Sequence, residues 1–153
     1  MKKLFLLFLW LVFITGCQPK TTEYVHYHNE RFAFELDYPS FMTMDPPPEN
    51  GDGIRCHGKG MELVAYGCQD LSWLMLDDLN PKGFDSYPQD GIFYVKSSVD
   101  VDGTVYYTKS ARFPNTDNGN IILTLQLTYS KGQIDSATIH YILNSFCFHG
   151  NNE

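Results

Sequence analysis

Residues 121–129 place a large apolar side chain at every second position, and this pattern constrains the fold more than any other feature of the sequence. The positions are Ile121, Leu123, Leu125, Leu127 and Tyr129. A period of two is typical of a β-strand with one face on the core. The chain is therefore expected to build a sheet with at least one buried face.

Further strands are predicted around two hairpin signals. Residues 54–56 and 61–66 flank His57-Gly58-Lys59-Gly60, and residues 92–101 and 104–113 flank Asp102-Gly103, a dipeptide typical of a two-residue type I′ turn. Two more strands are expected nearer the N-terminus, at residues 24–28 and at residues 32–38, where Pro39 ends the alternation. Residues 39–53 are expected to form a loop.

Two segments carry helical spacing. Leu71–Leu79 precedes the stop signal Asn80-Pro81-Lys82-Gly83, and residues 134–146 have one apolar side. Ser130 and Gln133 fit a capping box for the second helix. The expected fold class is α+β, an antiparallel sheet of about six to seven strands with two helices packed on it.

The N-terminus carries an export signal. Lys2 and Lys3 precede an apolar run from Leu4 to Ile14, which is too short to span a bilayer but fits the core of a signal peptide. Ile14-Thr15-Gly16-Cys17 then resembles the lipobox of bacterial lipoproteins. We expect cleavage between Gly16 and Cys17 and a lipid on Cys17 that anchors the chain to a membrane.

These signals define three regions: a signal peptide over 1–16, a lipidated tether over 17–22 and a single domain over 23–150. The expected location is the bacterial cell envelope. In a Gram-negative host, Gln18 favours the outer membrane, since Asp at that position resembles an inner-membrane retention signal. The sequence leaves the envelope type open.

The charge of the chain excludes one class of partner. Without Lys2 and Lys3, nine basic residues face 18 acidic ones, a net charge of −9 with neutral histidines. Such a domain is repelled by nucleic acid.

Three cysteines remain besides Cys17, which is an odd number. Cys56, Cys68 and Cys147 leave one thiol over if a single disulfide forms, and three pairings are possible. Cys68 with Cys147 is favoured, because Cys56 lies in a strand-like run where a buried apolar residue is expected. A CxxC motif is missing from the sequence, so thioredoxin-like redox chemistry is not indicated.

His26 and His28 are two residues apart and would point to the same face of a strand. Together they would supply two of the three or four ligands of a zinc or copper site, but no further ligand lies nearby in the sequence. His149 or Asp37 completes the set only if the fold brings it close. We therefore expect no metal or other cofactor, with His26 and His28 as weak candidates.

The long loop is the best candidate for contact with a partner, because it is stiffened by prolines and rich in acidic residues. The candidate contact residues are Asp45, Glu49, Asn50, Asp52 and Arg55. Their spacing is not that of an EF-hand.

Catalytic motifs are missing from the sequence: neither G-x-S-x-G nor a suitably placed S-x-x-K is present. Adjacent Cys56 and His57 would point to opposite faces of a strand and cannot act as a catalytic pair. The chain is expected not to be an enzyme.

Three sequence pieces resemble a group of small bacterial envelope proteins with a PsbP-type fold, shared by the photosystem II extrinsic protein and the Ran-binding import factor Mog. The pieces are residues 29–40 (NERFAFELDYPS), 47–53 (PPENGDG) and 63–67 (LVAYG). Cys56 departs from the pattern, because the relatives have an aromatic core residue there. The resemblance implies a binding or accessory module rather than an enzyme.

We therefore expect a membrane-anchored accessory lipoprotein with an envelope protein as partner. The alternative is a lipoprotein that binds a small ligand or metal, and a less favoured one is an envelope hydrolase.

Overall fold

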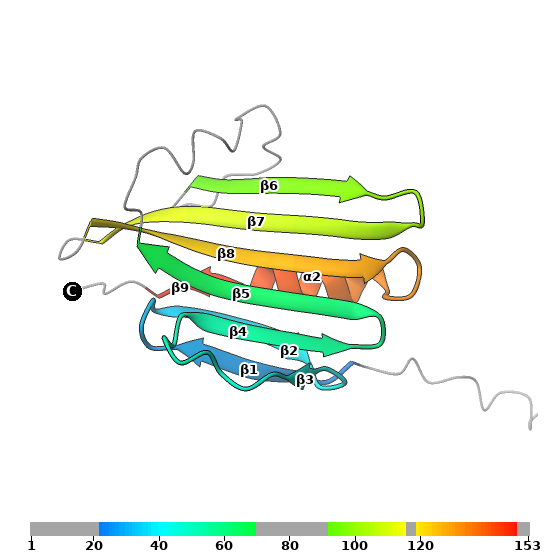
Figure 1. The fold of residues 1–153 in the computed structure, drawn as a ribbon, viewed down its shortest axis with the longest axis horizontal. Coiled ribbons are helices and arrows are strands. Elements are labelled where there is room, and N and C mark those ends of the chain that lie inside the picture. Colours follow the sequence, from blue (N-terminus) through cyan, green and yellow to red (C-terminus); the bar gives the residue numbers. More distant parts are fainter. Residues whose placement is uncertain (1–21, 70–91, 116–118, 150–153) are drawn as a thin grey trace, which may run out of the picture.

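The computed structural model describes residues 22–69, 92–115 and 119–149. These residues form nine strands in two antiparallel sheets and one helix (Figure 1). The α+β class with antiparallel strands is confirmed. The single sheet of six to seven strands is wrong, and the predicted helix Leu71–Leu79 lies outside the described residues.

The larger sheet has the order β3-β4-β5-β8-β7-β6. Its strands are β3 (Thr43–Met44), β4 (Gly53–Gly58), β5 (Met61–Gln69), β6 (Ile92–Val99), β7 (Thr104–Asn115) and β8 (Gly119–Ser130). Both predicted hairpins are present in it. In the β4–β5 hairpin, Lys59 and Gly60 have φ values of 48° and 72°, as a two-residue type I′ turn requires.

The β6–β7 turn differs from its prediction. It spans Asp100–Gly103 rather than Asp102-Gly103 alone, since the Gly103 amide donates to the Asp100 carbonyl at 3.0 Å. The carboxylates of Asp100 and Asp102 also accept the amides of Val101 and Thr104. These local bonds favour the longer turn.

The smaller sheet has the order β1-β2-β9, from β1 (Tyr24–Asn29), β2 (Phe34–Pro39) and β9 (Cys147–Phe148). It therefore joins the first and last strands of the described chain. The split into two sheets was missed because local hairpin signals specify which neighbours pair but not where the chain leaves a sheet.

The helix α2 (Ser136–Ser145) has its N-cap at Asp135, five residues after the Ser130 cap that the capping box indicated. The Asp135 carboxylate accepts the backbone amide and the hydroxyl of Thr138, both at 2.8 Å. Ser130 and Gln133 instead close a turn through a backbone bond of 3.1 Å. The predicted capping box is therefore wrong.

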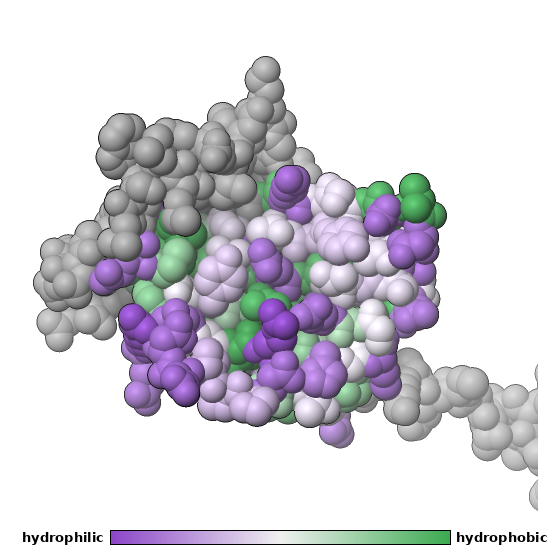
Figure 2. All heavy atoms as spheres, viewed as in Figure 1, coloured by the Kyte–Doolittle hydropathy of each residue, from purple (hydrophilic) through white to green (hydrophobic). Residues whose placement is uncertain are grey.

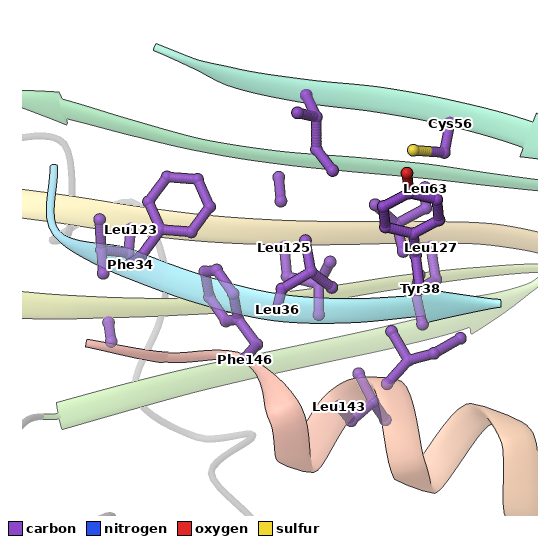
Figure 3. Close-up of a cluster of buried hydrophobic side chains, with 14 of the residues drawn as sticks. Phe34, Leu36, Tyr38, Cys56, Leu63, Leu123, Leu125, Leu127, Leu143 and Phe146 are labelled. Atoms are coloured by element: carbon purple, nitrogen blue, oxygen red, sulfur yellow. The ribbon is translucent and has the colours of Figure 1, made fainter. Parts of the chain in front are cut away.

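The hydrophobic core lies between the two sheets and α2. Phe34, Leu36 and Tyr38 of β2 face Leu123, Leu125 and Leu127 of β8, with Leu143 and Phe146 beside them (Figure 3). Cys56 is fully buried there, as predicted, and burial raises the pKa of its thiol to about 11. The opposite face of the six-stranded sheet, seen in Figure 2, is a mixture of hydrophilic and smaller hydrophobic areas.

Candidate metal centre

Six side chains with ligating atoms share the outer face of the three-stranded sheet. They are His26 and His28 of β1, Glu35 and Asp37 of β2, Cys147 of β9, and His149 just after β9. In each of these three pairs, the two residues are separated by one position, so their side chains point to the same side of the sheet. The alternate residues of β2, Phe34 and Leu36, are fully buried in the core on the other side.

The strand register brings these pairs together. His26 is opposite Asp37, His28 is opposite Glu35, and Glu35 is opposite Cys147. The His149 amide donates to the Ala33 carbonyl at 2.7 Å, which holds the end of the chain beside β2.

Glu35 is the centre of the cluster. Its Oε2 lies 2.8 Å from His149 Nε2 and 3.9 Å from His26 Nε2, while its Oε1 lies 3.1 Å from His28 Nδ1. The Glu35 side chain is 27% exposed and that of His149 is 58% exposed. The carboxylate is thus partly desolvated, while its partners remain accessible from solvent.

Cys147 adds a sulfur ligand to Glu35 and His149. Its Sγ lies 3.4 Å from His149 Nε2, and one ligand atom from each of the three residues lies within 4.8 Å of the others. In tetrahedral zinc sites, bond lengths place an N and an S ligand about 3.6 Å apart, and N and O ligands about 3.3–3.5 Å apart. The Cys147–His149 distance is already close to this spacing, and the Glu35–His149 distance must lengthen by about half an ångström to reach it.

Asp37 organises the other side of the cluster. Its Oδ1 lies 2.8 Å from His26 Nδ1, and its Oδ2 accepts the hydroxyl of Tyr141 at 3.1 Å. Tyr141 stacks on Tyr24 with ring centroids 4.0 Å apart. The Asp37 amide donates to Ser145 Oγ at 2.9 Å. Asp37 is therefore hydrogen-bonded to the C-terminal half of α2, through Tyr141 and Ser145.

Two groups of the cluster have raised pKa values. The hydrogen bond to Asp37 raises the pKa of His26, with smaller contributions from the charges of Asp37 and Glu35. Burial raises the pKa of the Cys147 thiol, and the charge of Glu35 raises it further. Coordination by either group requires loss of its proton, so metal affinity is expected to increase with pH.

The sequence located part of this centre. It singled out His26 and His28 and named His149 and Asp37 as ligands that the fold would have to bring close, which the fold does. Glu35 and Cys147 were missed in this role. The available signal was three pairs of ligating residue types at i, i+2 spacing: His-x-His, Glu-x-Asp and Cys-x-His.

The Cys68–Cys147 disulfide favoured from the sequence is not formed, because Cys147 has a free thiol. Cys68 lies on β5 of the six-stranded sheet and alternates with the core-facing Ala65 and Gly67. Cys147 lies on the outer face of the other sheet. The core separates the two side chains.

The candidate partner loop is pinned to the β1–β2 turn. Arg31 donates to the Asn50 carbonyl and to Asp52 Oδ1 at 2.6 Å, and Asn50 donates to Asp52. Asp45 lies 3.0 Å from His57 Nδ1. Of the other two candidates, Arg55 pairs with Glu62 at 3.5 Å, and Glu49 is exposed.

Gly16 and Cys17 lie outside the described residues. Within the described ranges, no helix is long and apolar enough to cross a membrane.

No protein-family model and no curated protein matches the chain. Among solved structures, a crystal structure from Bacteroides thetaiotaomicron matches 84% of the chain with a TM-score of 0.51 and 11% identity. The chain spans about half of that protein, 49% of its length. The solution structure of cyanobacterial PsbP (CyanoP) from Synechocystis matches 89% of this chain and 99% of its own, with a TM-score of 0.44 and 13% identity. At such identities, the Bacteroides structure supports a likeness of fold alone.

Proposed function

We propose that the chain is a non-enzymatic lipoprotein of the bacterial envelope that binds a transition-metal ion, zinc in the first place. One observation carries this proposal: a carboxylate, a thiol and an imidazole from two strands and the segment after them converge on one point, with ligand atoms within 4.8 Å of one another. The three residues are Glu35, Cys147 and His149.

The donor types favour this metal class. Zinc accepts Cys, His and Glu together, and thiolate and imidazole are typical ligands of zinc and copper. Calcium and magnesium prefer sets of six or more oxygen ligands, which this cluster does not offer. The proposal thus replaces the expectation of a cofactor-free protein with the alternative that the sequence left open.

The anchor and the fold type belong to the same proposal. A lipid on Cys17 would hold the domain at the membrane by a short tether, because only six residues separate Cys17 from Tyr24, the first residue of β1. The PsbP-type fold is supported by the order of hairpins followed by a C-terminal helix.

A second candidate function is contact with an envelope protein through the loop at residues 45–52. The three prolines and Glu49 are exposed, and Arg31 and Asn29 bind the loop from the β1–β2 turn, the latter through the Gly51 carbonyl at 3.0 Å. A loop held in one shape loses less conformational entropy on binding. Crosslinking in cells should capture one envelope protein, and this capture should be lost with Arg31→Ala plus Glu49→Ala.

The metal proposal is tested on the full lipidated chain purified in detergent. Zinc titration, followed by metal analysis after dialysis, should give one tightly held ion per chain. Cys147→Ser, His149→Gln and Glu35→Gln should each weaken binding. His57→Gln is the matched control, because His57 is an equally exposed histidine paired with a carboxylate, Asp45, away from the cluster.

Circular dichroism and thermal unfolding would check that each variant is folded. A folded wild-type chain that holds no zinc, or equal binding by the three variants and the wild type, would overturn the proposal.

A further inference from the structure

We propose that His26 is the fourth ligand of the metal, so that the centre is a closed, four-coordinate site of one Cys, two His and one Glu. This inference rests on the proposed function and goes beyond the three converging residues. It decides whether the ion keeps an open position for a reacting water or is fully held by the protein.

The first argument is the oxygen that His26 faces. Glu35 Oε2 lies 2.8 Å from His149 Nε2 and 3.9 Å from His26 Nε2. The Nε2 atoms of His149 and His26 thus face the same carboxylate oxygen of Glu35. Ligands of tetrahedral zinc lie about 3.3–3.5 Å apart, so one distance must lengthen and the other shorten by about half an ångström. His26 lies outside the group of three whose ligand atoms are all within 4.8 Å of one another, so its ring must also rotate toward Cys147 and His149 to bind the same ion. The His26 side chain is 59% exposed and has room to rotate.

The second argument is the hydrogen bond on the other nitrogen of His26. Its Nδ1 lies 2.8 Å from Asp37 Oδ1. When Nδ1 donates to this carboxylate, Nε2 carries the free lone pair that a metal needs. Metal-ligating histidines commonly show this carboxylate–histidine arrangement, which fixes the tautomer and the ring orientation.

His28 has a different position. Its Nδ1 lies 3.1 Å from Oε1 of Glu35, the oxygen on the far side of the carboxylate from His149. A hydrogen bond there leaves Oε2 free to ligate. His28 is therefore a positioning residue for Glu35, as ligating carboxylates are themselves hydrogen-bonded.

Asp37 and Tyr141 are also positioning residues. Tyr141 holds Asp37 from α2 at 3.1 Å, and Asp37 orients His26. A four-coordinate centre of this kind leaves the ion without a position for a nucleophilic water, in contrast to the three-ligand sites of zinc hydrolases. The bound metal is then stored, sensed or passed on rather than used for hydrolysis.

Cobalt(II) is the probe that tests the ligand set, because its visible bands report the ligands around the ion and change when a bound water ionises. The full chain in detergent should show strong bands together with a thiolate-to-cobalt charge-transfer band. His26→Gln should keep the charge-transfer band, but a water would take the vacated position, so the visible bands of this variant should change as that water ionises with pH, whereas those of the wild type should not. Asp37→Asn and Tyr141→Phe should lower zinc affinity by about 10- to 100-fold, and His57→Gln should change neither measurement.

The outcomes separate this inference from the proposed function. If the wild type binds no cobalt or zinc, the proposed function fails. If Cys147→Ser abolishes the charge-transfer band while His26→Gln leaves both the spectrum and the affinity unchanged, the metal site stands and the fourth ligand is refuted. A pH dependence of the visible bands that appears equally in His28→Gln and His26→Gln would also refute the assignment of His26.

Discussion

Gly67 lies directly beneath the ring of Phe32: a Cβ at position 67 would be 2.2 Å from Phe32 Cγ. Phe32 is buried and precedes β2, while Gly67 belongs to β5 of the other sheet. The absence of a side chain at this position therefore lets the β1–β2 hairpin approach the six-stranded sheet.

We expect Gly67→Ala to destabilise the fold by about 1–3 kcal/mol, the typical cost of overpacking. Urea denaturation of the full chain in detergent measures this change. Adding Phe32→Leu should recover part of the loss, because the two residues are in contact and their effects are not additive. A Gly67→Ala variant as stable as the wild type would show that Phe32 can move aside freely.

The N-cap of α2 predicts a pH dependence. Hydrogen bonds from the amide and hydroxyl of Thr138 lower the pKa of Asp135 below its usual 3.8. A group with a lowered pKa in the folded state contributes stability above its unfolded pKa, and this contribution is lost as pH falls through the folded value.

Asp135→Ala should therefore cost about 1 kcal/mol at neutral pH, and this difference from the wild type should shrink steadily below pH 4. Asp135→Asn is the control: it caps without a charge, so it should retain most of the stability at pH 7. Chemical denaturation at several pH values provides the measurement. A constant difference between Asp135→Ala and the wild type down to pH 2 would contradict the assigned cap.

The thiols should differ in reactivity. Burial raises the pKa of Cys56 to about 11 and excludes reagents from it. Cys147 is only partly buried on the outer face of its sheet. Mass spectrometry after brief maleimide treatment at pH 7.5 should find Cys147 modified well before Cys56.

Zinc should protect Cys147 and leave the slow rate at Cys56 unchanged. Equal labelling of the two residues in folded protein would show that the core around Cys56 opens readily. Fast labelling of Cys147 in saturating zinc would argue against a thiolate ligand.

The proposed lipid anchor makes a separate prediction. Cys17→Ser should release the protein from the membrane fraction, because the acyl chains have no other attachment point. Cys56→Ser, a change at a buried thiol, should leave the membrane fraction unchanged. Fractionation of cells that express each variant decides the matter, and a Cys17→Ser protein that still requires detergent for extraction would disprove the lipid anchor.

Most strands of the fold could be predicted because their signals are local. The alternation at residues 121–129 lies inside β8, and the His57–Gly60 and Asp102-Gly103 signals fall at real hairpins. Two strands of two residues, β3 and β9, were missed, since two residues cannot show a period. The start of α2 was misplaced because Ser130 and Asp135 are both good caps and only packing selects between them.

The centre depends on information that no local pattern contains. His26 and His28 were recognisable, but Glu35 becomes a ligand only through the β1–β2 register. Cys147 joins it only because β9 pairs with β2 at a distance of more than 100 residues along the chain. The same missed strand thus explains both the wrong disulfide and the missed ligand set.

The placement of β1 links the metal centre to the resistance of the domain against a pulling force. A pull on a lipid anchor would enter the domain at Tyr24 and act on β1, an edge strand whose one strand neighbour among the described residues is β2. An ion bound by His26, Glu35, Cys147 and His149 would crosslink the first strand of the described chain to the last one. Ligand present at 100 times its dissociation constant adds about 2.7 kcal/mol against unfolding. A metal-loaded domain should therefore withstand a greater load applied through such an anchor than a metal-free one.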